Sequence, residues 1–187
     1  MSAAQLTDAT DEQLMLAYRE GDQAAFGELF SRYAERLMHA AMRIVDDEAS
    51  ARDVVQQAFL QMHRARNDFD GKRRFRPWIY TIALNLARDE RRRRGRRRED
   101  ELNREPESRA SDGDPDAYVA TTERRRRMAK ALETLSEEQR QVVVLHWYEG
   151  LSFPEIAETT GAGLSAVKVR AHRAYKKLKA VLTPDTF

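Results

Sequence analysis

The sequence of 187 residues contains no cysteine, which excludes disulfide bonds, cysteine-ligated zinc and thiol-based redox sensing within the chain. Its eight glycines and five prolines are too few for the many tight turns of an all-β fold. The chain also lacks an N-terminal apolar run of signal-peptide type and any apolar stretch of about 18 residues. We therefore expect a soluble, cytoplasmic protein that does not insert into a membrane.

A catalytic site is missing from the sequence as well. The four histidines are scattered and there is no glycine-rich phosphate loop, so no constellation for catalysis is visible. Asp46, Asp47 and Glu48 are candidate metal ligands, but three carboxylates at this place are also explained by the start of a helix, where the helix dipole favours negative charge. We expect neither an enzyme nor a protein with a metal or cofactor.

The net charge of +2 conceals a strong segregation of charge along the chain. Between Lys72 and Arg98 there are twelve basic and two acidic residues, whereas Glu99 to Tyr118 contains eight acidic and two basic residues. The interval between Glu158 and Asp185 contains six basic residues and no acid. Two basic segments of this kind favour contact with nucleic-acid phosphates.

Apolar residues recur every three or four positions in the N-terminal half, which predicts helices. Thr10 begins a capping box for a helix that runs to about Glu20, and Asp22 can cap a second helix that runs to about Val45. A third helix is expected to end near Arg66. The predicted core face of the second helix is Phe26, Leu29, Phe30, Tyr33, Leu37, Ala40, Ala41 and Ile44, and that of the third is Ala51, Val54, Val55, Ala58, Phe59 and Met62.

The next elements are predicted from turn residues and from Pro77. Asn67 to Arg76 combines Asn, Asp and Gly and interrupts the helical period. Pro77 suits the first position of a fourth helix that ends in the arginine run. The predicted buried side of this helix is Trp78, Ile79, Ile82, Ala83 and Leu86. Residues 99–122 lack apolar periodicity and predict an acidic flexible linker between a domain of residues 1–98 and a domain of residues 123–187.

Residues 150–182 have the pattern of a helix-turn-helix. Ala157 sits where two helices approach closely, Gly161 falls at the turn, and Val167 lies in the shared core. A capping box of Ser136 and Gln139 begins the helix that precedes the motif; the β-branched run from Val142 to Leu145 leaves a strand as the alternative there. The apolar stripe of the second helix of the motif is Leu164, Val167, Ala171, Ala174 and Leu178.

The face of that second helix opposite its apolar stripe is basic, and we expect it to be exposed. Residues at such positions of a recognition helix reach base edges in the major groove. A basic amphipathic helix that merely closes a bundle is the alternative, although two glycines before the helix favour a tight turn. The outward residues are Ser165, Lys168, Val169, His172, Arg173 and Lys176.

Three stretches occur in a familiar order: Asp53–Phe59 (DVVQQAF), Phe75–Asp89 (FRPWIYTIALNLARD) and Leu135–Leu178. Together they resemble the extracytoplasmic-function (ECF) sigma factors, the compact initiation subunits of bacterial RNA polymerase. The resemblance implies an all-α fold of two small helical domains joined by an acidic flexible linker, the C-terminal domain being a helix-turn-helix. It also implies promoter-specific initiation with core RNA polymerase, by reading the −35 and −10 elements of promoter DNA and assisting promoter melting.

The resemblance assigns three sets of contact residues. Binding to core polymerase, through its β′ and β subunits, is implied for Asp53, Gln56, Gln57 and Phe59. Recognition of the −10 element is implied for Asn67, Asp68, Lys72, Arg73, Arg74, Tyr80, Asn85 and Arg88. Recognition of the −35 element is implied for Ser165, Lys168, Val169, His172, Arg173 and Lys176.

A free-standing helix-turn-helix regulator that acts without polymerase docking is the alternative function. It has no use for the Asp53–Gln57 motif, and the chain shows no heptad run for dimerisation. The sequence departs from the family where Gln57 replaces a frequent Glu and where Val169 replaces a small polar residue. The resemblance leaves open whether an anti-sigma factor holds the chain inactive and whether the linker enters the RNA-exit channel.

Overall fold

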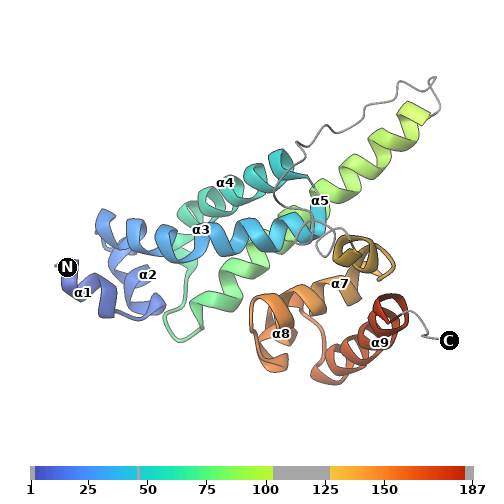
Figure 1. The fold of residues 1–187 in the computed structure, drawn as a ribbon. Coiled ribbons are helices and arrows are strands. Elements are labelled where there is room, and N and C mark those ends of the chain that lie inside the picture. The colour runs from blue at the N-terminus through green and yellow to red at the C-terminus, as the bar shows by residue number, and fades with distance from the viewer. Residues whose placement is uncertain (1–2, 46, 103–126, 184–187) are drawn as a thin grey trace, which may run out of the picture.

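The computed structural model describes residues 3–45, 47–102 and 127–183, and the elements found in these ranges are helices joined by turns and loops (Figure 1). No strand occurs in the described ranges, as the composition predicts. The residues from Val142 to Leu145 are helical, so the strand alternative at this place is wrong. Within the described ranges, no helix combines the length and apolar character that crossing a bilayer requires.

The second and third helices begin at the predicted caps, whereas the first helix was not predicted. The short helix α1 (Ala3–Asp8) precedes α2 (Asp11–Arg19), and the Thr10 capping box that begins α2 is present in both directions. Gly21 adopts a φ of 104°, a conformation that favours glycine, and it separates α2 from α3 (Gln23–Val45). The Asp22 carboxylate accepts hydrogen bonds from the backbone N–H groups of Ala24 and Ala25. The local signals therefore predicted these boundaries correctly.

Helix α4 (Glu48–Arg64) lies against α3, and Asp47 caps it by accepting the N–H of Ser50 at 2.8 Å. This contact confirms that Asp47 and Glu48 mark a helix start, while Asp46 lies outside the described residues. The helix ends two residues earlier than predicted, and a single 3₁₀ turn, η1 (Arg66–Asp68), follows it. All six predicted core residues of α4 are buried.

Helix α5 (Phe75–Leu102) differs from its prediction at both ends. It begins two residues before Pro77, and the Glu12 carboxylate accepts the N–H of Phe75 at 2.9 Å. It also continues through the arginine run, so the expectation that the helix ends there is wrong. Arginine is a good helix former, and Arg93 and Arg94 pair with the acids Glu90 and Asp47. The helix therefore crosses the predicted boundary at residue 98, and the rest of the predicted linker lies outside the described residues.

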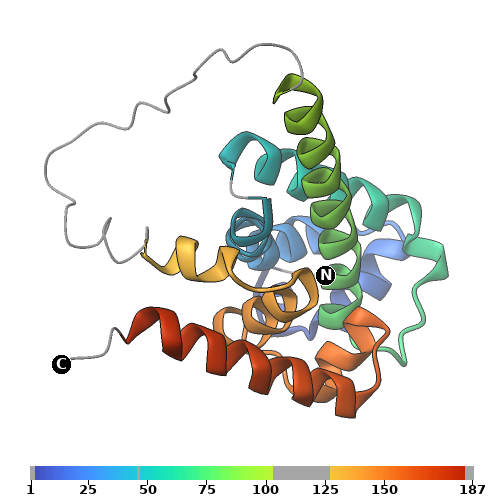
Figure 2. The same ribbon diagram turned by 90° about the vertical axis from the view of Figure 1, so that its right-hand side faces the viewer.

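The C-terminal half is a bundle of short helices that ends in the longer α9 (Figure 2). Residues 127–133 are helical, and the Ser136 capping box begins α7 (Glu137–Val143) as predicted. One turn of π-helix, η2 (Val144–Tyr148), continues α7. Helix α8 (Phe153–Thr160) and helix α9 (Leu164–Leu182) complete this half.

The two halves share a hydrophobic core, which the sequence does not predict. Buried side chains of α3, α4 and α5 pack in one continuous cluster with Leu145, Leu151 and Ile156 of the C-terminal half. Helix α5 contacts α8, and η2 contacts α3. A second, smaller cluster, of Ala131, Leu132, Leu135, Val143, Ala174 and Leu178, joins α9 to the helix of residues 127–133. Of two aromatic side chains predicted to lie in the core, Trp78 is partly buried and packs on the core against Phe69, whereas Phe30 is 46% exposed.

Candidate nucleic-acid interface

The predicted helix-turn-helix is formed by α8 and α9. A capping box of Ser152 and Glu155 begins α8, and Gly161 ends it in the left-handed conformation with a φ of 65°. Val167 of α9 is completely buried in the shared core, and Ala157 is partly buried. These positions confirm the motif that the spacing of Ala157, Gly161 and Val167 predicts.

One predicted member of the apolar stripe on α9 is wrong. Leu164 is 41% exposed, because it is the first residue of the helix and lies beyond the packed turn. Val167, Ala171, Ala174 and Leu178 are buried as expected.

The opposite face of α9 is open and basic. Lys168 and Arg173 are exposed, and neither pairs with an acid in the part of the chain that the structure describes. A helix whose exposed cations have no internal partner leaves them free for phosphates and for the acceptor edges of bases. All six predicted contact residues lie on this exposed face: Ser165, Lys168, Val169, His172, Arg173 and Lys176.

The loop between η1 and α5 forms a second basic surface. The backbone N–H groups of Lys72 and Arg73 donate to Asp70, which shapes a tight turn at Gly71. A Cβ at Gly71 would lie 2.9 Å from Leu16, so the turn packs closely on α2. The predicted −10 residues of this segment are exposed: Asn67, Asp68, Lys72, Arg73 and Arg74.

A polar cavity of about 460 Å³ lies beside this loop. Its acids already have partners: Asp11 pairs with Arg32 at 2.9 Å, Glu12 accepts the N–H of Phe75, and Glu155 accepts from Ser152 and Arg74. Its cations outnumber these acids, since the cavity is lined by Lys72, Arg73, Arg74 and Arg76. The loop is therefore a surface with spare positive charge, which suits a nucleic-acid backbone.

The predicted −10 residues of α5 are placed unequally. Asn85 is exposed, whereas Arg88 pairs with Glu137 at 2.5 Å and donates to Gln141 at 2.9 Å. Tyr80 is fully buried and donates its hydroxyl to Glu149 at 2.5 Å. Burial, together with this hydrogen bond, raises the pKa of Tyr80, so the hydroxyl remains a donor. In this arrangement of the two halves, Tyr80 therefore lies in the core and not on the exposed surface of α5.

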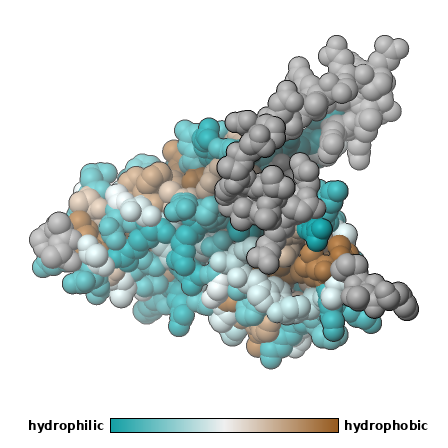
Figure 3. Space-filling model, in the orientation of Figure 1, coloured by the Kyte–Doolittle hydropathy of each residue, from teal (hydrophilic) through white to brown (hydrophobic). Residues whose placement is uncertain are grey.

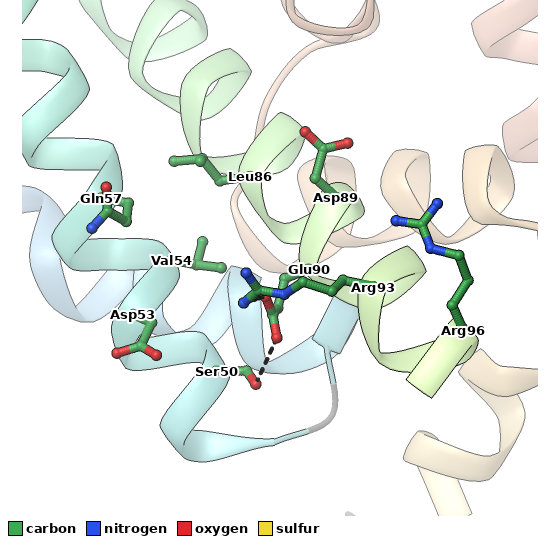
Figure 4. Close-up of a pocket in the computed structure, with 9 residues that line it drawn as sticks. All are labelled: Ser50, Asp53, Val54, Gln57, Leu86, Asp89, Glu90, Arg93 and Arg96. Atoms are coloured by element: carbon green, nitrogen blue, oxygen red, sulfur yellow. Dashed lines mark hydrogen bonds and ion pairs between the residues drawn. The ribbon is translucent and has the colours of Figure 1, made fainter. Parts of the chain in front are cut away.

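Two of the predicted polymerase-binding residues of α4, Asp53 and Gln57, line a second cavity (Figure 4). Asp53, Gln56 and Gln57 are exposed, as a docking surface requires. Phe59 does not belong to this surface: it is only 5% exposed, and its ring contacts the rings of Phe26 and Phe30. Its role in the fold is to fill the space between α3 and α4.

The cavity itself has a volume of about 300 Å³ and lies between α4 and α5 (Figure 4). Glu90 closes its floor by accepting a hydrogen bond from Ser50 at 3.4 Å and by pairing with Arg93. Asp53 and Asp89, which also line it, pair with no cation among the described residues. The surface therefore presents unpaired carboxylates beside amides, a combination that accepts hydrogen bonds from arginine or lysine.

Sequence reasoning missed two groups of residues. Phe30 and Leu60 are exposed apolar side chains beside the buried Phe59. The sequence also did not predict which residues of the C-terminal half contact the N-terminal half, namely Glu137, Gln141, Glu149 and Glu155. Glu137 and Glu155 are visible in the sequence as acids in the first turn of a helix, but the arginine of the N-terminal half with which each pairs is not.

The chain combines a helix-turn-helix that has an open basic face with a second helical unit that has a basic loop and an acidic docking surface. This combination defines a DNA-binding protein that acts in transcription and is built from two helical units. Residues 29–97 match the family Sigma-70 region 2, and residues 125–178 match the family Sigma-70, region 4. The RNA polymerase sigma factor CarQ of Myxococcus xanthus is 38% identical over 168 residues, with 90% of this chain and 95% of that protein covered. The ECF RNA polymerase sigma-E factor of Escherichia coli strain K12 is 31% identical, with 94% and 95% covered.

Solved structures show the same relationship. CnrH, in complex with the cytosolic domain of CnrY, has a TM-score of 0.75 and 33% identity, with 94% of this chain and 99% of that chain covered. RpoE of Bartonella quintana, in complex with the anti-sigma factor NepR, has a TM-score of 0.67 and 25% identity, with 86% and 98% covered. The chain belongs to the ECF sigma factors, the regulatory DNA-binding subunits that direct RNA polymerase to specific promoters.

Proposed function

We propose that the two halves of the chain divide promoter recognition between them. Helix α9 reads the −35 element, and the loop of residues 67–74 together with the exposed side of α5 reads and melts the −10 element. The observation that carries this proposal is the coexistence of two separate basic surfaces, α9 and the loop, each with cations that pair with no described acid.

The proposal for α9 rests on its docking geometry. Val167 and Ala171 hold the inner face of the helix against the core, so Lys168, His172 and Arg173 point outward together. Residues in the first turns of a recognition helix contact base edges, and a lysine or arginine donates to the O6 and N7 acceptors of guanine. Lys176 lies about one turn after His172 and about two turns after Lys168, and it suits a phosphate contact.

The proposal for the loop rests on its charge and its polar edges. Promoter melting requires that unstacked bases are held while cations follow the single-stranded backbone. Asn67 and Asp68 supply hydrogen-bonding edges, and Lys72 and Arg73 supply charge beside the 460 Å³ cavity. Asn85 extends the surface along α5.

Core polymerase is proposed to bind the exposed face of α4. Asp53, Gln56 and Gln57 lie within little more than one helical turn and present one carboxylate and two amides. An arginine-rich element of the β′ subunit would satisfy all three. A subunit that works on polymerase acts where the chromosome is transcribed, in the cytoplasm.

Regulation by an anti-sigma factor is proposed from the solved relatives. The CnrH and RpoE structures contain CnrY and the anti-sigma factor NepR, respectively. A partner of this kind would keep this chain from core polymerase.

Transcription in vitro tests the proposal directly. We expect that core RNA polymerase initiates at specific start sites only when the purified chain is added, and that the chain alone binds the mapped promoter weakly. Tight, sequence-specific binding by the chain alone, without stimulation of polymerase, would instead support the regulator that acts without polymerase docking.

The docking face is tested by Asp53→Ala and Gln56→Ala. We expect each variant to lower affinity for core polymerase about tenfold, because each loses a polar contact of about 1–2 kcal/mol at the edge of the interface. Gln61→Ala is the matched control, since Gln61 is exposed on the same helix and outside the motif. Affinity is measured by competition with a labelled wild-type chain, and circular dichroism checks the fold. Wild-type affinity in both variants would remove α4 from the interface.

A further inference from the structure

The open face of α9 has a valine at its centre. The buried side of the helix is formed by Val167, Ala171, Ala174 and Leu178. At about 100° per residue, Val169 lies roughly 170° around the helix axis from the middle of that buried side. Its side chain is 48% exposed, and α9 lies at the edge of the molecule (Figure 2). Val169 is therefore the residue in the first two turns of α9 that points most directly away from the core.

Exposure alone does not distinguish this valine. Hydrophobic residues reach the surface of the molecule in several separate areas (Figure 3), and Val181, near the end of the same helix, is 46% exposed. The neighbours of Val169 distinguish it. Ser165 lies one turn before it, and His172 and Arg173 lie about one turn after it, all with exposed side chains. Val169 is thus an apolar position enclosed by the polar side chains that we propose to contact the −35 element.

The charged side chains of this face are all hydrogen-bond donors. Lys168, Arg173 and Lys176 donate and cannot accept, and the sequence has no acid between Glu158 and Asp185. On the major-groove edge of the bases, guanine offers two acceptors and thymine offers one, whereas cytosine offers only a donor. The charged residues of α9 therefore match a strand whose exposed edges are guanine and thymine.

A valine side chain neither donates nor accepts hydrogen bonds, so at this position it contributes only an apolar contact. The C5-methyl group of thymine is the apolar group that base pairs present in the major groove. We propose that Val169 contacts this methyl group, so that the −35 element contains a thymine close to a guanine that Lys168 or Arg173 contacts. This inference deepens the proposed function of α9 and rests on it.

Helix geometry limits how far apart the two bases lie. Val169 and Arg173 are separated by four residues, which is about 6 Å along the helix axis. Successive bases of one strand are about 3.4 Å apart along the duplex, so this separation corresponds to about two base pairs. Lys168 is adjacent to Val169 in the sequence and lies closer still. The thymine is therefore expected within about two base pairs of the guanine.

The first test removes the methyl group from the DNA and the valine from the protein. In a promoter mapped by the transcription assay, each thymine of the −35 element is replaced singly by deoxyuridine, which lacks the methyl group and keeps the O4 acceptor. We expect the wild-type holoenzyme to lose affinity about fourfold at one of these positions, the value for one buried methyl group. Val169→Ala is expected to weaken binding to the thymine promoter by a similar factor. It should then lose nothing further at that deoxyuridine, because both changes remove the same contact.

Val181→Ala is the matched control, because it removes the same atoms from a valine of nearly equal exposure on the same helix. Val181 lies twelve residues after Val169, about 18 Å further along the axis. We expect this variant to bind like wild type and to show the full deoxyuridine effect. Circular dichroism checks the fold of both variants.

The second test locates the thymine without a prior choice of position. A promoter library with a randomised −35 element is transcribed by holoenzymes that contain the wild-type chain or Val169→Ala. We expect the wild type to enrich thymine at one position near an enriched guanine, and the variant to lose the preference for thymine and keep that for guanine. A merely structural role of Val169 would instead lower transcription from all sequences equally.

Two results would overturn the inference: an enriched −35 element without a thymine near the guanine, or equal deoxyuridine effects in the wild type and in Val169→Ala. Failure of the proposed function of α9 has a different signature. In that case Lys168→Ala and Arg173→Ala would also keep full discrimination between −35 sequences. If only the inference is wrong, these two variants lose discrimination while the methyl group has no effect that depends on Val169.

Discussion

Replacing Lys168 or Arg173 with alanine is expected to lower discrimination between the cognate and a scrambled −35 element by about 1–3 kcal/mol, roughly 5- to 150-fold. The reason is geometric, because both side chains lie on the exposed face of a helix whose other face is fixed in the core. Lys177→Ala is the matched control for Lys168: Lys177 lies on the opposite side of α9, about two and a half turns further along, and donates to the Thr134 carbonyl at 3.5 Å. Holoenzyme affinity for the two promoters provides the measurement.

The arginine run should behave in the opposite way. Arg96 and Arg97 are exposed and pair with no described acid, whereas Arg93 and Arg94 are held by Glu90 and Asp47. We expect Arg96→Ala and Arg97→Ala to weaken binding equally for both promoters, and each lost phosphate contact to take about 0.9 from the log–log salt slope. If these variants lost discrimination and the Lys168 and Arg173 variants kept it, α9 would not be the element that reads −35.

Leu145→Ala is expected to lower the free energy of unfolding by about 2–5 kcal/mol. Leu145 is completely buried in η2, where the core of the N-terminal half continues into the C-terminal half. Truncation leaves a cavity in this shared core, and the neighbouring side chains can fill it only in part. Urea denaturation followed by circular dichroism measures the loss, and the core contact predicts that the N-terminal half is destabilised as well.

Leu164→Ala is the control for this prediction, since the same atoms are removed from a side chain that is 41% exposed. We expect a loss below about 1 kcal/mol, because little apolar surface returns to water. Equal losses for the two variants would mean that the shared core contributes nothing to stability.

Helix starts were the most predictable part of the fold. Thr10, Ser136 and Asp47 each cap a helix at the predicted place, because a capping hydrogen bond joins residues only two or three positions apart. The turn at Gly161 was predictable for the same reason. These interactions are complete within a few residues, so the sequence contains all the information that they need.

Helix ends and burial were less predictable. Phe30 matches the apolar period of α3 and is nevertheless exposed, because an apolar stripe is wider than the surface that its neighbours cover. The arginine run continues as a helix because Glu90 of α5 itself and Asp47, which caps α4, offset its charge, and Asp47 is remote in the sequence. Such pairings depend on how helices pack, which the local pattern does not specify.

The candidate nucleic-acid interface also has a part that the sequence determined and a part that it did not. The sequence by itself determined the helix-turn-helix, the basic face of α9, the basic loop and the exposed motif on α4, since periodicity and charge along a helix decide which residues face outward. Only the tertiary structure decided that Tyr80, Arg88 and Arg74 contact Glu149, Glu137 and Glu155. Those residues are about 50 to 80 positions apart, and their contact depends on how the apolar surfaces of α5 and α8 meet. Burial of apolar area is non-directional, so no short pattern in the sequence encodes which two surfaces will share it.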